Sequence, residues 1–279
     1  MNFQHPNALR KRFDFIAKKS FGQNFLVHTP TLKTLSEKIL RLKPKTILEI
    51  GPGPGSLTQW LLPEVEQMIV VEKDAQFSTL LKEILSPAEK VKIILADFLD
   101  CDLTEILKDC PSPLFAVGNL PYHVSVAILK KLLEHRSFFS QFFLMFQKEV
   151  AERLCAKPNS KAYGSLSLYT QFLASAKILL PIPPSSFDPR PKIDSAVVQL
   201  SPYPTSLCPE LELSFFEKLI QAAFSQRRKT LLNCLCANGF FEGNKERATQ
   251  HLNPLGLSGK ERAESLDLAT FIKLALSFF

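Results

Sequence analysis

The sequence predicts an α/β protein, in which helices cover both faces of a parallel sheet, followed by a small all-helical domain. Three observations predict it. Short apolar runs alternate with stretches of helical periodicity up to about residue 146. Only helical periodicity appears from residue 210 to residue 279. Apolar residues make up 46% of the chain and charged residues 22%, a balance that allows a buried core.

Each element has its own signal. The first is a helix at 31–42, in which Leu32, Leu35 and Ile39 recur on one face before Lys43-Pro44 ends it. Apolar runs predict strands at 46–50, 68–72, 91–96, 114–117, 141–146, 174–180 and 196–200. Helical spacing predicts the intervening helices at 57–62, 75–85, 124–134, 149–154 and 165–173.

Two proline-rich stretches and a basic start set the predicted domain boundaries. Residues 1–19 are polar and basic and predict a loose arm. Residues 181–191 hold too many prolines for regular structure, and a second proline-rich stretch at 201–209 marks a boundary. We therefore expect a basic arm at 1–19, an α/β domain at 20–203 and a helical domain at 204–279.

Composition excludes several classes of protein. The net charge of +7 and the pI of about 9.1 suit a polyanionic partner without proving one. The six cysteines form no Cys-x-x-Cys pair and the five histidines are scattered, so we expect reduced thiols and no metal. No secretory signal and no apolar run of about 18 residues occurs. We expect a cytoplasmic monomer without a membrane span.

A glycine-rich turn and two acids follow three successive strands. The turn, at 49–55, has the spacing Gly-x-Gly-x-Gly, which differs from the Gly-x-Gly-x-x-Gly of dinucleotide binders. Glu72 ends the second strand, where an acid can bind ribose hydroxyls, and Asp97 ends the third. Taken alone, the glycine is also consistent with an ordinary turn, and each acid with a strand end at the surface. Gly51, Glu72 and Asp97 together favour a nucleoside ligand.

The stretch Asn119-Leu120-Pro121-Tyr122 lies just beyond the fourth strand, where open α/β sheets bind ligands. Asn119 offers an amide oxygen. Leu120 precedes a proline, so its backbone is biased to an extended form that leaves its carbonyl free. Tyr122 offers a flat face. These groups suit a planar base with an exocyclic amine, although a plain strand-to-helix turn capped by Asn119 is the alternative.

These motifs carry a family resemblance. The glycine turn and the two acids resemble those of S-adenosylmethionine-dependent methyltransferases with a Rossmann-like class I fold. Asn119-Leu120-Pro121-Tyr122 resembles the Asn-x-Pro-Tyr motif of enzymes that methylate exocyclic amines. More narrowly, the chain is similar to the small-subunit rRNA adenine N6,N6-dimethyltransferases of the KsgA/RsmA type. Five segments carry this match in family order, at 22–26, 49–55, 119–122, 187–195 and 224–231.

The resemblance implies a role for each matching residue. S-adenosylmethionine would be the cofactor, with Asn24 and Leu26 closing over it and Gly51 facing its methionine end. Glu72 would bind its ribose and Asp97 its adenine. Asn119, also next to the cofactor, would serve the target base with Leu120, Pro121 and Tyr122. Phe187 would stack on that base opposite Tyr122, although a core aromatic is the other interpretation.

The implied reaction is dimethylation of two adjacent adenosines in small-subunit rRNA, with the 30S precursor as partner. The rivals are a large-subunit rRNA adenine methyltransferase of the antibiotic-resistance type and a non-catalytic RNA-binding assembly or transcription factor. The candidates for phosphate contacts are Lys18, Lys19, Lys148, Arg153, Arg227, Arg228 and Lys229, although for any single one of them a solvated surface charge is the favoured interpretation.

Overall fold

A computed structural model describes residues 4–18, 21–85 and 89–279. Its contacts divide the chain into two compact units. The N-terminal unit comprises residues 1–151 and 177–204, and the C-terminal unit comprises 152–176 and 205–279. The division after residue 204 lies next to the predicted boundary. Residues 152–176, which were expected in the first domain, group instead with the C-terminal helices.

A seven-stranded sheet organises the N-terminal unit, in the order β4-β3-β2-β5-β6-β9-β7. The first five of these strands run parallel, and β9 pairs antiparallel with β6. The α/β class with a mostly parallel sheet is therefore confirmed. The strands are β2 (Thr46–Ile50), β3 (Gln67–Glu72), β4 (Val91–Leu95), β5 (Leu114–Asn119), β6 (Gln141–Gln147), β7 (Ala174–Ile182) and β9 (Ser195–Pro202).

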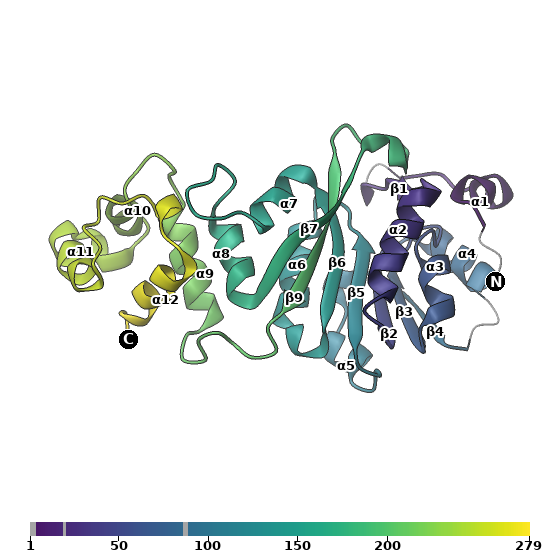
Figure 1. The fold of residues 1–279 in the computed structure, drawn as a ribbon, viewed down its shortest axis with the longest axis horizontal. Helices are drawn as coiled ribbons and strands as arrows, with labels where there is room; N and C mark the ends of the chain where they lie inside the picture. The colour runs from purple at the N-terminus through teal and green to yellow at the C-terminus, as the bar shows by residue number, and fades with distance from the viewer. Residues whose placement is uncertain (1–3, 19–20, 86–88) are drawn as a thin grey trace. The chain divides into compact units, whose positions relative to one another are not determined.

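Amphipathic helices cover the sheet. In Figure 1, α2 lies in front of the strands and α6 lies behind them. On α2 the buried side chains Leu32, Leu35 and Ile39 recur at helical spacing, which is why this segment folds as a helix against the sheet. The helices of this part are α2 (Thr29–Leu40), α3 (Thr58–Leu61), α4 (Ala75–Leu85), α5 (Leu103–Leu107) and α6 (Ser125–Glu134), and α7 (Lys148–Leu154) spans the division after residue 151.

The basic arm is not wholly loose, contrary to the sequence prediction. It contains the helix α1 (Pro6–Phe13), whose Leu9 is fully buried in the apolar core. Phe15 follows with 6% exposure, and Arg12 pairs with Glu83. Two buried apolar side chains are enough to attach a segment whose composition is otherwise polar.

Two short strands join segments that the sequence left without structure. Strand β1 (Phe25–Leu26) pairs antiparallel with β8 (Phe187–Asp188), with Leu26 opposite Phe187. The expectation that 181–191 lacks regular structure is therefore wrong at the end of β7, at the 3-10 turn Pro184–Ser186 and at β8. The pairing holds the segment that precedes α2 against the segment that precedes β9.

The C-terminal unit is helical. Its helices are α8 (Ser165–Leu173), α9 (Leu213–Ala223), α10 (Leu231–Ala237), α11 (Lys245–Leu252) and α12 (Leu268–Leu276). Phe172 of α8 stacks on Phe216 of α9 with ring centroids 4.4 Å apart, and the Tyr163 hydroxyl donates to the Leu266 carbonyl at 2.9 Å. These contacts explain why 152–176 belongs here. Among the described residues, no helix combines the length and apolar character needed to cross a membrane.

Candidate functional site

A cavity of about 220 Å³ lies at the carboxyl edge of the sheet. The ends of β2, β3 and β5, the residues directly after β4, and the segment 21–25 form its walls. The register brings these ends together, because Ile50 lies opposite both Val71 and Gly118, and Glu72 lies opposite Leu95. This is the edge at which open α/β sheets bind ligands.

The glycine turn supplies a wall made of main chain. Gly51 has a φ of +62°, and a Cβ added there would meet nothing within 4 Å, so the position opens onto free space. Gly53 has a φ of +55°, and a Cβ there would lie 2.9 Å from the Phe25 ring. Both conformations favour glycine. A ligand can therefore approach the backbone of this turn more closely than side chains would allow.

Glu72 is 5% exposed and ties the glycine turn to the end of β3. Its Oε2 accepts from the Gly53 amide at 3.0 Å and its Oε1 from the Asp74 amide at 2.8 Å. Burial raises the pKa of this carboxyl, and the backbone hydrogen bonds oppose that rise. Each oxygen retains acceptor capacity for a ligand hydroxyl.

The pKa of Asp97 is shifted in the opposite direction from that of Glu72. Its Oδ2 accepts from the Lys73 ammonium at 2.6 Å and its Oδ1 from the Leu99 amide at 3.0 Å. The Lys73 hydrogen bond, followed by the Leu99 amide, holds the pKa of Asp97 below its ordinary value. The cavity therefore carries an ionised, fixed acceptor at the end of β4.

Asn119 is held by a backbone carbonyl from the segment 21–25. Its Nδ2 donates to the carbonyl oxygen of Asn24 at 2.7 Å. A carbonyl can only accept, so the amide NH₂ group must face Asn24 and the amide oxygen is left as an acceptor. Within the part of the chain that the structure describes, no hydrogen bond reaches the Leu120 carbonyl. Two oxygen acceptors therefore stand next to each other in the chain beside the cavity.

Tyr122 contributes an aromatic wall of fixed orientation. Its hydroxyl lies 2.6 Å from the Ser195 hydroxyl at the start of β9, and Ser195 is 1% exposed. Burial raises the pKa of the tyrosine above its ordinary value. Pro121 lies beside the ring in the same wall. A neutral phenol anchored at its tip keeps the plane of its ring in place.

Most predicted site residues line this cavity, namely Asn24, Gly51, Glu72, Asp97, Asn119, Leu120, Pro121 and Tyr122. Leu26 and Phe187 do not. They are 5% and 4% exposed and belong to the apolar core, because the pairing of β1 with β8 turns both side chains inward. Phe187 is thus packed in the core in this structure, and its role as a stacking face opposite Tyr122 stays a prediction.

Sequence reasoning missed the residues that attach Lys18 and the segment 21–24 beside the cavity. Asp74, 2% exposed, accepts from the Lys18 ammonium at 2.9 Å and from the Gln23 amide at 3.1 Å. Phe21 and Lys73 also line the cavity. In the sequence, Phe21 directly precedes the motif at 22–26 and Lys73 directly follows Glu72. These positions were the one signal for a site, since neither a phenylalanine nor a lysine alone indicates one.

The basic candidates have different surroundings. Lys18 pairs with Asp74, and Lys19 lies outside the described residues. Arg227 donates to the Glu264 carboxylate at 2.8 Å, to the Lys161 carbonyl at 2.6 Å and to the Ser160 carbonyl at 3.4 Å. It holds loops of the C-terminal unit together. Lys148, Arg153, Arg228 and Lys229 are exposed.

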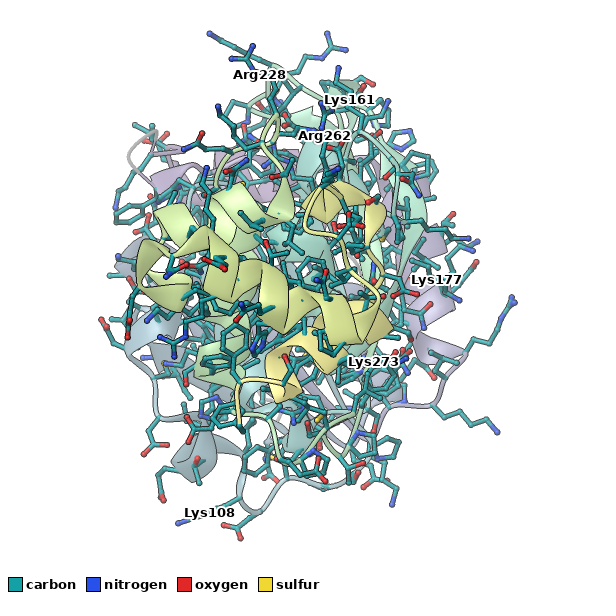
Figure 2. All side chains as sticks on the ribbon, turned by 90° about the vertical axis from the view of Figure 1, so that its left-hand side faces the viewer. Lys108, Lys161, Lys177, Arg228, Arg262 and Lys273 are labelled. Atoms are coloured by element: carbon teal, nitrogen blue, oxygen red, sulfur yellow. The ribbon has the colours of Figure 1, made fainter. Side chains whose placement is uncertain are left out.

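Arg228 lies on a surface formed by residues that are far apart in the sequence. In Figure 2, Lys161, Arg228 and Arg262 project at the same end of the C-terminal unit. Their loops contact each other, since Arg227 donates to the Lys161 carbonyl and the Leu231 amide donates to the Glu261 carbonyl at 2.7 Å. We call Lys161, Arg228 and Arg262 the basic loop cluster. Among the described residues, no group of three or more His, Cys, Asp or Glu side chains is placed to hold a metal.

Comparisons with known proteins agree with this geometry. The family model described as "Ribosomal RNA adenine dimethylase" matches residues 14–274. The "Ribosomal RNA small subunit methyltransferase A" of Streptococcus pneumoniae (strain CGSP14) is 38% identical, covering 98% of this chain and 96% of the relative. The protein of the same name from Oceanobacillus iheyensis is 36% identical, covering 96% and 92%.

Solved structures share the fold. A dimethyladenosine transferase from Plasmodium falciparum superposes with a TM-score of 0.74 at 27% identity, covering 88% of this chain and 95% of that one. The 23S rRNA methyltransferase ErmE superposes with a TM-score of 0.66 at 25% identity, covering 91% and 99%. The predicted Rossmann-like class I methyltransferase fold with a helical C-terminal region is confirmed.

Proposed function

Because the chain belongs to the ribosomal RNA adenine dimethylase family, we propose that it transfers methyl groups from S-adenosylmethionine to two adjacent adenosines of small-subunit (16S) rRNA. The product on each adenosine is N6,N6-dimethyladenosine. One observation carries the proposal beyond family membership. The Asn24 carbonyl fixes the Asn119 amide with its oxygen as the free acceptor, next to the unbonded Leu120 carbonyl.

The walls of the cavity fit the proposed cofactor. Gly51 exposes main chain to free space, which suits the methionine end. Glu72 has acceptor capacity for the ribose hydroxyls, and the ionised Asp97 suits the 6-amino group of adenine. The cofactor supplies an electrophilic methyl group on a sulfonium. In this assignment each residue would face the part of the cofactor that its chemistry can recognise.

The chain's own task is to make a poor nucleophile attack. The N6 lone pair of adenine is delocalised into the ring. When the Asn119 amide oxygen and the Leu120 carbonyl accept the two N6 hydrogens, the nitrogen turns toward a tetrahedral geometry and its lone pair points out of the ring plane. Oriented acceptors and alignment of the reactants supply the rate enhancement. Neither oxygen needs to change its protonation state before the transfer.

The target base must be unpaired or flipped to reach these oxygens. Tyr122, whose ring is fixed through Ser195, provides a face for stacking. A second stacking face at Phe187 would require its ring, which is 4% exposed in this structure, to become accessible to the base. The helical C-terminal unit would select the RNA, with the basic loop cluster contacting phosphates. We treat the enzyme as a cytoplasmic monomer that acts on the 30S precursor.

The decisive experiment supplies purified protein with radiolabelled S-adenosylmethionine and unmethylated ribosomal subunits. We expect label in the small subunit, on two adjacent adenosines with two methyl groups each, and labelling slowed about 10²–10³-fold in the Asn119→Ala variant. Large subunits are assayed in parallel, since ErmE, named as a 23S rRNA methyltransferase, shares the fold. Label confined to large subunits, or no binding of S-adenosylmethionine at all, would overturn the proposal.

The basic loop cluster has its own test. Neutralising Lys161, Arg228 and Arg262 together should weaken RNA binding and reduce the slope of log affinity against log salt by about one unit per phosphate contact. Lys177 and Lys108, which lie in the N-terminal unit, provide a matched control pair for neutralisation. An unchanged slope in the triple variant would remove the cluster from the RNA footprint.

A further inference from the structure

Lys73 is an unassigned residue at the rim of the cavity. Its ammonium lies 2.6 Å from Asp97 Oδ2 and 5.8 Å from the centroid of the Phe21 ring. Its side chain is 57% exposed, so folding of the core does not require it. Both of its partners line the cavity.

Phe21 is flanked by a second lysine. The Lys18 ammonium lies 5.3 Å from the Phe21 centroid and pairs with the buried Asp74 at 2.9 Å. Two ammonium groups, each anchored on an acid that follows β3 or β4, therefore lie near one aromatic ring. Cation–π attraction favours this arrangement over a free ring at the surface.

Asp97 depends on Lys73 for its orientation. The Leu99 amide restrains one carboxylate oxygen and Lys73 restrains the other. With both restraints the plane of the carboxylate is fixed, and its remaining lone pairs point in set directions. A preorganised acceptor loses less entropy when a ligand binds. With Lys73 removed, the Leu99 amide would be the one remaining donor to this carboxylate among the described residues.

We propose that Lys73 is a positioning residue for the cofactor, which holds the Asp97 carboxylate in one orientation and Phe21 over the same end of the cavity. This inference rests on the proposed function, because it takes the ligand at Asp97 to be the adenine of S-adenosylmethionine. A competing role for Lys73 predicts the opposite change in cofactor affinity. If Lys73 merely competed with the ligand for Asp97, its removal would tighten binding.

Calorimetry with S-adenosylhomocysteine tests the proposal without relying on activity. Lys73→Met should weaken binding about threefold to tenfold at low salt, and Lys73→Arg should retain most of the affinity. Raising NaCl from about 50 to about 500 mM should weaken binding to the wild type and to Lys73→Arg, and leave Lys73→Met almost unaffected, because salt screens exposed ion pairs.

Lys108→Met is the matched control. Lys108 is 54% exposed and pairs with Glu105 at 2.8 Å, away from the cavity. Its loss should change neither affinity nor salt dependence. In an Asp97→Asn background, Lys73→Met should have little further effect, since the carboxylate that it positions is gone. Thermal unfolding of each variant verifies that it is folded.

Three outcomes overturn the inference: unchanged affinity in Lys73→Met, tighter binding in that variant, or the same loss in the Asp97→Asn background. These differ from failure of the proposed function. If the wild type binds neither S-adenosylmethionine nor S-adenosylhomocysteine, the cofactor assignment fails. If the wild type binds both and Lys73→Met binds equally well, only the role of Lys73 fails.

Discussion

The hydrogen bond from the Asn119 amide to the Asn24 carbonyl leads to a prediction that separates two explanations of the site. Asn119→Ala removes the acceptor oxygen altogether. Asn119→Asp keeps an oxygen acceptor but replaces the NH₂ group, 2.7 Å from the Asn24 carbonyl, with a second oxygen. Two oxygens at that distance repel each other, so the aspartate side chain should rotate away. Orientation of the acceptor, rather than its presence, is then what the second variant tests.

The expected loss of rate can be estimated from enzymes in which one oriented hydrogen-bonding group was removed. Removing one oriented hydrogen-bonding group from a transition state typically slows a reaction by about 10²–10³-fold, which corresponds to about 3–4 kcal/mol. We expect a loss of this size in both variants, because neither keeps the oriented amide oxygen. Cofactor affinity should change by less than about threefold, since Glu72, Asp97 and the glycine turn remain in place.

The assay is single-turnover methyl transfer to unmethylated small subunits, with cofactor binding measured separately by calorimetry. Loss of transfer with binding retained supports the role of the amide. If Asn119→Asp transferred methyl groups within about tenfold of the wild type, fixation by Asn24 would not be needed for catalysis. If Asn119→Ala did so, the acceptor role of residue 119 would be wrong.

Three further predictions concern the turn, the aromatic wall and a buried acid. Gly53→Ala should lower both stability and cofactor affinity, because its Cβ would lie 2.9 Å from the Phe25 ring at a φ of +55°; thermal unfolding and calorimetry measure this. Tyr122→Phe should cost about 1 kcal/mol of stability by leaving buried Ser195 without its partner, and should slow transfer more than it weakens cofactor binding. Burial raises the pKa of Glu49 from 4.5 to about 7. The folded state therefore holds a proton that the unfolded chain releases, and stability should fall by about 3 kcal/mol between pH 4.5 and 7. Urea unfolding should show this difference between the wild type and Glu49→Gln; equal pH profiles would contradict it.

The sequence predicted the sheet well because each strand signal is local. Strand β2 consists of five buried residues that follow Lys45 and run up to Gly51, and its predicted bounds match. The pairing of β1 with β8 could not be predicted in the same way. A two-residue strand has no period to detect, and its partner lies about 160 residues further along the chain. Only the folded chain brings these segments together.

The residues of the site also separate into those with a local sequence signal and those without one. Asn119, Glu72 and Asp97 were identifiable because each follows a predicted strand, and parallel strands end at one edge. The Asn24 carbonyl was not identifiable as a partner of Asn119, since the two residues lie 95 positions apart. Burial decides the rest. Phe187 stands among prolines and charges in the sequence, yet its register opposite Leu26 turns it into the core.

Arg227 and Arg228 show why residue type alone does not identify an RNA contact. The sequence presents the two arginines as equivalent, but the guanidinium of Arg227 is committed to three acceptors in the chain, whereas Arg228 projects from the basic loop cluster. Neutralising Arg227 would leave the Ser160 and Lys161 carbonyls and Glu264 without their donor. A triple variant of Arg227, Arg228 and Lys229 would therefore mix loss of folding with loss of RNA binding. Arg228 with Lys161 and Arg262 reports on RNA binding alone, because these charges can be removed without breaking that set of hydrogen bonds.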